Sequence, residues 1–232
     1  MLYLGLVLYG ASGALQVRSD LGLDPWNVLH QGIASHTGLA IGTVSVIVGA
    51  VVLLGWIPLR QRPGLGTVSN VVLVGSSMNV TLTLLPGSGL LLWRIPEMLG
   101  GILLCGLASG MYIGARFGPG PRDGLMTGLA RRTGRSLRLV RACIELTVLA
   151  IGWLLGGTVG VGTVLFAVGI GPLVQFFLPL LDTAVPVTGG SPAPVQPVLP
   201  DERASNRGSD REVSTGDQPR RRLGQWGRWR SR

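Results

Sequence analysis

The sequence predicts an all-α membrane protein built from two related halves, and three observations support this prediction. Charged residues make up only 13% of the chain, whereas soluble domains carry roughly 25%. The apolar residues gather in six runs, each close to the ~20 residues that cross the hydrocarbon core of a bilayer. Residues 5–86 also align without a gap onto residues 101–182, with 23 identities in 82 pairs. A duplicated apolar unit is the construction that many transporters use.

The duplication predicts a first membrane repeat at residues 1–95 and a second at residues 96–185. Six apolar runs are expected to be transmembrane helices, three in each repeat. The first run is expected to be a structural helix rather than a signal peptide, because it lacks a basic start and a cleavage site and it has a repeat partner. The six runs are Met1–Val17, Ile41–Leu59, Thr67–Leu85, Ile95–Ala115, Leu139–Leu155 and Gly162–Leu181.

A short helix is expected between the first and second run of each repeat. In the first repeat Asp24, an N-cap residue, is followed by Pro25 and the segment closes at Gly38. In the second repeat Pro121 and Gly134 occupy the matching positions. Twelve or 13 residues at 1.5 Å each give about 19 Å, which is too short to cross a bilayer. Each short helix is therefore expected either to lie at the interface or to enter the membrane and return.

The arginines indicate the orientation of the chain, which contains no lysine. If the short helices do not cross, each repeat has three spans, and the second repeat is inverted relative to the first. Eight arginines of the two repeats then lie on the cytoplasmic side with both termini, and Arg18 and Arg94 lie outside, which agrees with the positive-inside rule. The eight are Arg60, Arg62, Arg116, Arg122, Arg131, Arg132, Arg135 and Arg138.

Glycines on two of the expected spans predict close helix packing. Gly106, Gly110 and Gly114 form a ridge of small residues at intervals of four, and Gly10 and Ala14 repeat its first two positions. The main expectation is packing between the two halves within one chain. A homodimer face is the alternative.

Polar residues inside apolar runs are costly, so they are the candidate site residues. Asn79 and Gln175 are repeat partners, expected either to hydrogen-bond between helices or to face a central cavity. Glu145 follows Arg141 by one helical turn, which favours an internal ion pair over a proton-coupling carboxylate.

The starts of the short helices carry a further set of candidates. Asn27 and Asp123 are repeat partners in the first turns of these helices, where they either cap the helix or face a shared site, with Asp24 and Arg122 nearby. The candidate substrate-site or pore-lining residues are Asn27, Asp123, Asn79, Gln175, Asp24, Arg122 and Glu145.

Other functional classes are not expected. The isoelectric point near 11.3 could suggest nucleic-acid binding, but arginine clusters in a hydrophobic chain more often set membrane orientation. Cys105 and Cys143 sit in apolar runs, and His30 and His36 lack companion ligands, so no metal site and no cofactor is expected. The chain has no zinc-protease motif, phosphate-binding loop or nucleophile triad, so an enzyme is not expected.

Residues 186–232 differ in composition from the rest of the chain. They are rich in proline, polar residues and arginine, and they end in a segment that alternates arginine with tryptophan, Arg220–Arg230. This composition predicts a disordered cytoplasmic tail. The tail is expected either to contact anionic lipid or to remain free of partners.

The motif Gly22-Leu23-Asp24-Pro25-Trp26-Asn27-Val28-Leu29 and its echo Gly118-Pro119-Gly120-Pro121-Arg122-Asp123-Gly124-Leu125 resemble the YczE branch of the YczE/YyaS/YitT bacterial membrane proteins. The resemblance covers about residues 1–182. It implies a multi-pass protein of the bacterial inner membrane and supplies no substrate, catalytic residue or ligand residue.

These observations lead to one main functional hypothesis and one alternative. The main hypothesis is a small transporter or permease-like protein that lies in the lipid bilayer and holds an unknown small-molecule substrate between inverted repeats. The alternative is a non-transporting membrane scaffold or accessory protein. A transporter is expected to have a water-accessible cavity lined by the two short helices with Asn79 and Gln175, whereas a scaffold is expected to pack these positions dry.

Overall fold

The computed structural model describes residues 1–85 and 91–182, and these residues form helices and their connections without any strand. The fold of this part of the chain is therefore all-α, as the sequence predicts. The expected tail at residues 186–232 lies outside the described residues. The described helices are α1 (Leu2–Ser19), α2 (Pro25–Thr37), α3 (Ile41–Leu54), α4 (Leu65–Leu84), α5 (Leu91–Gly114), α6 (Pro121–Thr133), α7 (Leu137–Leu154) and α8 (Val161–Leu181).

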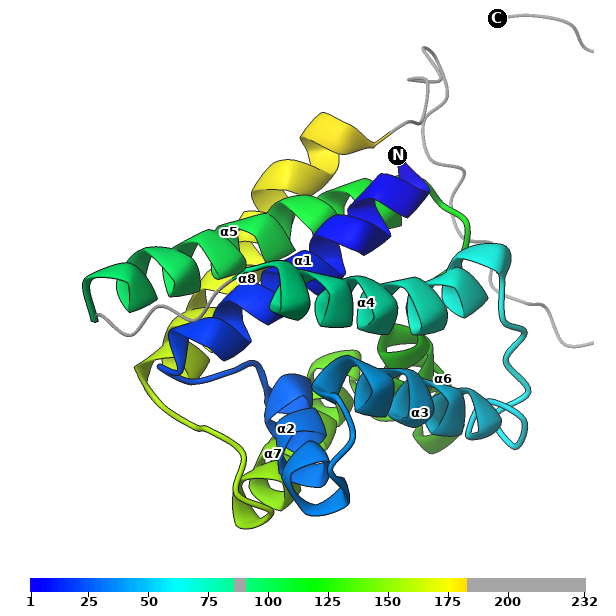
Figure 1. The fold of residues 1–232 in the computed structure, drawn as a ribbon. Coiled ribbons are helices and arrows are strands. Elements are labelled where there is room, and N and C mark those ends of the chain that lie inside the picture. The colour runs from blue at the N-terminus through cyan, green and yellow to red at the C-terminus, as the bar shows by residue number, and fades with distance from the viewer. Residues whose placement is uncertain (86–90, 183–232) are drawn as a thin grey trace, which may run out of the picture. The chain divides into compact units, whose positions relative to one another are not determined.

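The helices pack in two groups (Figure 1). Helices α1, α4, α5 and α8 form one group, in which α5 packs on both α1 and α8 and α4 packs on α1. Helices α2, α3, α6 and α7 form the other, in which α2 packs on α7 and α3 packs on α6. The contact of α3 with α4 joins the groups. Adding 96 to a residue number of the first repeat gives the matching residue of the second repeat. By this correspondence the contact of α1 with α4 matches the contact of α5 with α8, and the contact of α2 with α7 matches that of α6 with α3.

Three described helices are long and apolar enough to span a membrane: α4, the segment Leu92–Gly114 of α5, and α8. A fourth candidate is the pair α2 and α3, which bend by 113° at the break between them. This count supports a membrane protein and falls short of the six spans expected. Helix α3 is shorter than its apolar run, because after Leu54 the chain turns and Pro58 has no N–H to continue a helix.

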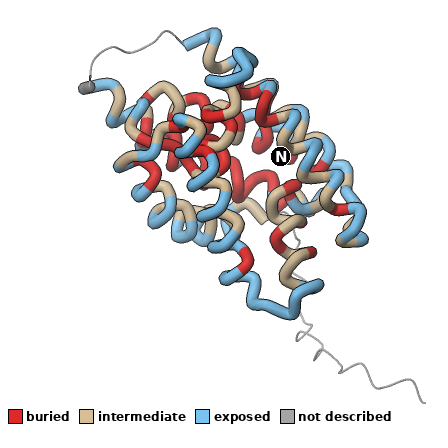
Figure 2. Tube along the Cα trace, turned by 90° about the horizontal axis from the view of Figure 1, so that it is seen from below, coloured by how far each residue is buried: buried red, intermediate tan, exposed pale blue. Residues whose placement is uncertain are grey.

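Polar side chains lie inside this fold and many apolar side chains lie outside. Gln16, Asp24 and His30 are buried, whereas Val161, Val168 and Leu180 of α8 are mostly exposed. Figure 2 shows the buried residues gathered along the inner faces of the helices. A helix that presents its apolar residues outward suits a lipid environment, because lipid carries no penalty for such contact.

Backbone conformations recur at matching positions of the two repeats. Gly22 and Gly118 have φ of +118° and +117°, and Gly38 and Gly134 have φ of +70° and +65°. Glycine takes these values at little cost because it has no Cβ. Each repeat thus enters its short helix through the same glycine turn and leaves it through the same left-handed cap.

The two repeats also exchange matching contacts. The Gly66 N–H at the start of α4 donates to the Phe117 carbonyl at 2.9 Å, and the Gly162 N–H at the start of α8 donates to the Leu21 carbonyl at 2.8 Å. Each hydrogen bond joins one repeat to the other. Helices α1 and α5 are antiparallel, since Gly5 lies against Met111 and Gly101 against Ser12.

Small residues mediate the closest helix contacts. Their partners correct the expectation that the glycine ridge of α5 packs between the two halves. A Cβ on Gly106 would meet Leu173 at 2.7 Å, one on Gly110 would meet Phe177 at 3.0 Å, and one on Gly114 would meet the Leu181 carbonyl at 2.7 Å, all on α8. The Gly106–Gly114 ridge therefore packs within its own repeat rather than between the halves, because α5 presents a different face to α1.

The first repeat uses small residues in the same way. Gly10 of α1 packs on α4, also within one repeat, and Ala14 is fully buried beside Ile41 and Met78.

Replacing Gly10 with alanine is expected to destabilise the protein. The new Cβ would lie 2.2 Å from the Val74 carbonyl oxygen and 1.9 Å from the Ser77 Oγ, so α1 and α4 must separate, at a cost of about 1–3 kcal/mol. Gly100→Ala is the matched control, because nothing lies within 4 Å of its Cβ position. Thermal unfolding of the detergent-solubilised variants measures both, and equal midpoints would contradict this packing.

Candidate functional site

A cavity of about 300 Å³ lies among the helices and is lined by residues of all eight. Its volume is at the lower end of the range of small-molecule sites. Its wall is mixed, with valine, isoleucine and aromatic side chains beside charged ones. The sequence candidates that line it are Asp24, Arg122, Asp123, Glu145 and Gln175.

The two short helices both begin at this cavity. Pro25 and Trp26 of α2 line it, as do Gly120 and Pro121 at the start of α6. Proline fits the first helical position because the N–H it lacks would have no partner within the helix. The Asp24 side chain accepts hydrogen bonds from the backbone N–H of Trp26 at 3.2 Å and of Asn27 at 3.3 Å. Asp24 is therefore the N-cap of α2.

The two short helices reach the cavity from opposite ends of the bundle. Leu21 lies at the start of α8 and Phe117 at the start of α4. These starts are at opposite ends, because α4 runs parallel to α1 and α8 runs parallel to α5, whereas α1 and α5 are antiparallel. After meeting at the cavity, the helices diverge: Gly32 of α2 contacts Leu155 and Gly128 of α6 contacts Leu59. Each short helix therefore begins at the cavity and ends away from it.

An ion pair joins the two helix starts. The Arg122 Nη1 lies 3.7 Å from the Asp24 Oδ1, and the Arg122 guanidinium carbon lies 4.8 Å from the centre of the Trp26 ring. The Asp24 side chain is 8% exposed and that of Arg122 is 24% exposed. Removing one partner of such a weakly solvated pair is costly, because the remaining charge loses its compensation. Arg122, one of the candidate site residues identified from the sequence, lies at the cavity.

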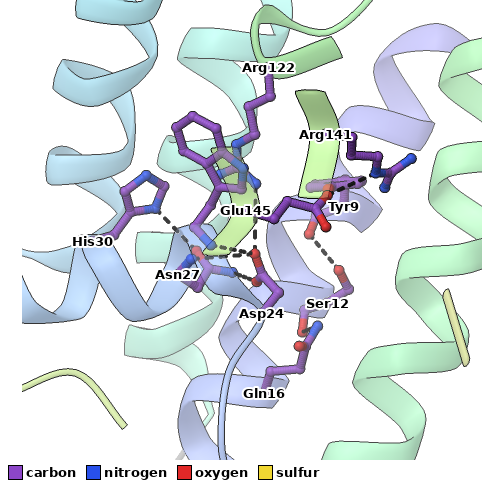
Figure 3. A network of polar contacts seen from close by, with 10 residues as sticks. Tyr9, Ser12, Gln16, Asp24, Asn27, His30, Arg122, Arg141 and Glu145 are labelled. Atoms are coloured by element: carbon purple, nitrogen blue, oxygen red, sulfur yellow. Dashed lines mark hydrogen bonds and ion pairs between the residues drawn. The ribbon is translucent and has the colours of Figure 1, made fainter. Parts of the chain in front are cut away.

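Asp24 also begins a chain of buried polar contacts along α2 (Figure 3). The Asn27 Nδ2 donates to the Asp24 Oδ2, and the Asn27 Oδ1 lies 3.2 Å from the His30 Nδ1. Because a carboxamide oxygen accepts, this contact assigns the proton to His30 Nδ1. Asn27 thus holds the Asp24 carboxylate by a hydrogen bond and does not itself line the cavity.

The second repeat places a different arrangement at the same cavity. The Tyr112 hydroxyl donates to the Asp123 Oδ2 at 3.1 Å. The Arg141 Nε donates to the Glu145 Oε1 at 2.8 Å, an ion pair one helical turn apart on α7. Tyr9 contributes a ring that meets the Tyr112 ring edge to face, with centroids 5.9 Å apart.

The structure does not bring Asn79 and Gln175 together. The Asn79 Oδ1 accepts from the Gly42 N–H at 2.9 Å, and its Nδ2 donates to the Thr43 Oγ1 at 3.1 Å. Asn79 therefore joins α4 to α3 away from the cavity, whereas Gln175 of α8 lines it.

Several cavity residues were not singled out from the sequence. Tyr9, Tyr112, Trp26 and His30 line the cavity or support its charged groups. A tyrosine in an apolar helix is usually interpreted as a packing residue. Neither tyrosine has a tyrosine at the matching position of the other repeat, so comparing the two repeats does not identify either one. Among the described residues, no three His, Cys, Asp or Glu side chains gather in a way that could hold a metal ion.

A charge pair outside the cavity lies at the end of α5. Arg116 donates to Asp182 at 2.7 Å and 3.1 Å. The hydrogen bond from the exposed Arg116 guanidinium to this carboxylate, with the attraction between their charges, raises the pKa of Arg116 above its ordinary value. The pair ties the ends of α5 and α8 together.

Comparison with known proteins agrees with a membrane location. Residues 1–179 match a family model described as a family of unknown function, DUF6198. The chain is 42% identical over 181 residues to an "Uncharacterized protein" of Haemophilus influenzae, covering 78% of this chain and 83% of the relative. It is 34% identical over 180 residues to the "Uncharacterized membrane protein YczE" of Bacillus subtilis, covering 76% and 83%.

A more distant relative is the "Uncharacterized protein YyaS" of Bacillus subtilis, 22% identical over 183 residues, covering 77% of this chain and 91% of the relative. No solved structure matches the chain.

Asp24→Asn is expected to lower stability by about 2 kcal/mol, because Arg122 loses its counter-charge while the asparagine can still cap α2. Asp20→Asn is the matched control. It removes the carboxylate that lies 3.7 Å from Arg94 in a more exposed position, where an ion pair contributes little. Thermal unfolding in one detergent compares the two, and an equal loss in both would contradict a special role for the Asp24–Arg122 pair.

Proposed function

This chain belongs to the YczE-like family of membrane proteins, and from that premise we propose that it is a small multi-pass transporter of the bacterial inner membrane. Its substrate site is the cavity at which α2 and α6 begin. The observation that carries the proposal is that two helix starts enter from opposite ends and meet at a cavity of about 300 Å³ lined by all eight helices.

The proposed architecture is a pair of inverted repeats with six membrane-crossing segments. Five are the helices α1, α4, α5, α7 and α8, and the sixth is α3 together with the hydrogen-bonded turns that continue it to Leu59. The antiparallel contact of α1 with α5 and the exchanged hydrogen bonds at Gly66 and Gly162 support it. Helices α2 and α6 then serve as re-entrant half-helices. Broken helices of this kind are tolerated at membrane depth where they line a cavity, because water or substrate can satisfy their free backbone groups.

The distribution of arginine supports an orientation with both termini in the cytoplasm. Among the described residues, the end of the bundle that holds Met1 and the start of α4 carries most of the arginines outside the cavity, and the other end holds Arg18 and Arg94. The arginines at the first end are Arg60, Arg62, Arg116, Arg131, Arg132, Arg135 and Arg138.

The scaffold alternative is less well supported by the site. A scaffold has no need of charged and polar groups around an unfilled space, and such groups are costly within an apolar bundle. The presence of Asp24, Arg122, Asp123 and Glu145 on the wall of one cavity favours an occupant.

Accessibility of single cysteines tests the topology. In a Cys143→Ser background, with buried Cys105 retained, Pro63→Cys and Arg131→Cys are expected to react with a membrane-impermeant maleimide from the same, cytoplasmic side. Gly156→Cys is expected to react from the opposite side. Labelling of intact cells and of inverted vesicles distinguishes the sides. Reaction of the first two positions from opposite sides would overturn the inverted arrangement.

Release of metabolites tests transport in a way that does not require the substrate to be identified first. Proteoliposomes loaded with a bacterial metabolite extract are expected to release at least one small molecule faster than protein-free vesicles, as measured by mass spectrometry. The double variant Asn27→Ala/Asp123→Ala is expected to lose this release while still inserting into the membrane. Asp20→Asn serves as the control with release retained. Release equal to that of protein-free vesicles would favour the scaffold.

A further inference from the structure

The charges on the cavity wall do not balance. Three carboxylates line the cavity, those of Asp24, Asp123 and Glu145, and two guanidinium groups line it, those of Arg122 and Arg141. With His30 neutral, the wall carries a net charge of −1. In a bundle of low dielectric constant, an unbalanced charge is costly unless a counter-ion or bound group compensates it.

The pairing within the cavity identifies the carboxylate in excess. Arg122 is paired with Asp24, and Arg141 is paired with Glu145. Within the described residues no arginine forms an ion pair with Asp123, whose one side-chain hydrogen bond comes from the neutral Tyr112 hydroxyl. Asp123 is therefore the cavity carboxylate that forms no ion pair with a described side chain.

The helix starts do not offer a site for an anion, although helix N-termini commonly bind one. The N-terminus of α2 is already capped by the Asp24 carboxylate. The N-terminus of α6 carries Asp123 in its first turn. An anionic group at this position would meet two carboxylates, so repulsion opposes it.

The rest of the wall suits an organic group. Val71 and Val74 of α4, Ile113 of α5 and Phe166 and Ile170 of α8 provide apolar surface. The Tyr112 hydroxyl lies next to the carboxylate to which it donates, so its oxygen can accept a hydrogen bond from an ammonium group bound at Asp123. The wall therefore combines one carboxylate outside any ion pair with an apolar and aromatic lining.

We propose that the cavity binds a small organic monocation, with its ammonium group on Asp123 beside Tyr112 and its apolar body against α4 and α8. This inference names the substrate class of the proposed transport site and rests on that proposal for the site's role in transport. The binding of the cation itself follows from the charge and lining of the cavity alone.

Three probes with the same ring and different charge test the proposal: benzylammonium, benzyl alcohol and benzoate. The full-length protein in nanodiscs is expected to bind benzylammonium at least tenfold more tightly than either of the others in calorimetric titration, a difference of about 1.4 kcal/mol. Asp123→Asn is expected to remove this preference and to leave the affinity for benzyl alcohol unchanged. Asp20→Asn, a carboxylate outside the cavity, is the control that keeps the preference.

A second measurement keeps the proposal testable if Asp123→Asn does not fold. Val71→Cys in the Cys143→Ser background places a thiol on the cavity wall, and benzylammonium is expected to slow its labelling by a small maleimide at least threefold, while benzoate does not. Equal binding of the three probes by the wild type, a preference retained in Asp123→Asn, or no selective protection would each overturn the inference.

Flux of benzylammonium separates this inference from the proposed function. Selective binding without counterflow into proteoliposomes would overturn transport and leave the cation site standing. Release of metabolites that are all neutral or anionic, by a protein that does not prefer benzylammonium, would overturn the cation site and leave transport standing.

Discussion

The structure depends on two helix starts that lie inside an apolar bundle and must satisfy their backbone groups there. A helix N-terminus leaves several N–H groups without partners, and lipid offers none. Asp24 answers this need in α2 by capping two N–H groups, and it also holds Arg122 at the start of α6. One carboxylate thereby fixes the approach of both halves and brings charge to the cavity.

The exchange of contacts between the halves follows from the same constraint. The segment that enters before each short helix lies against the first turn of the other repeat's last helix, at Gly162 and at Gly66. Side chains complement each other across this junction as well: the Trp56 ring fills the space above Gly124, while at the matching place Gly152 lies against Val28. A bulky residue in one repeat meets a glycine in the other, so neither half packs well alone.

Much of the architecture could be predicted from the sequence, and the reasons are local. Pro25 and Pro121 with their closing glycines define two helices of 13 residues, and the structure has them at Pro25–Thr37 and Pro121–Thr133. The candidate site was predictable only in part. Glu145 and Gln175 were identified because charged and carboxamide groups are rare in apolar runs, and Asp24, Arg122 and Asp123 because they stand at the starts of the two short helices. Tyr9 and Tyr112 were not identified, because a tyrosine in an apolar run carries neither signal. Asn79 shows the converse, a conspicuous polar residue whose partners on α3 keep it away from the cavity.

The sequence by itself determined the all-α class, the membrane location, the duplication and the two proline-started helices, because each depends on composition, on the alignment of one half with the other, or on residues close together in the chain. Only the tertiary structure decided which groups meet: Arg122 with Asp24 and Trp26 across 98 and 96 residues, the glycine ridge of α5 with α8, and the cavity itself. Such pairings depend on how helices far apart in the chain are oriented around one another. Repeat symmetry constrains that orientation but does not specify which side chain fills each space.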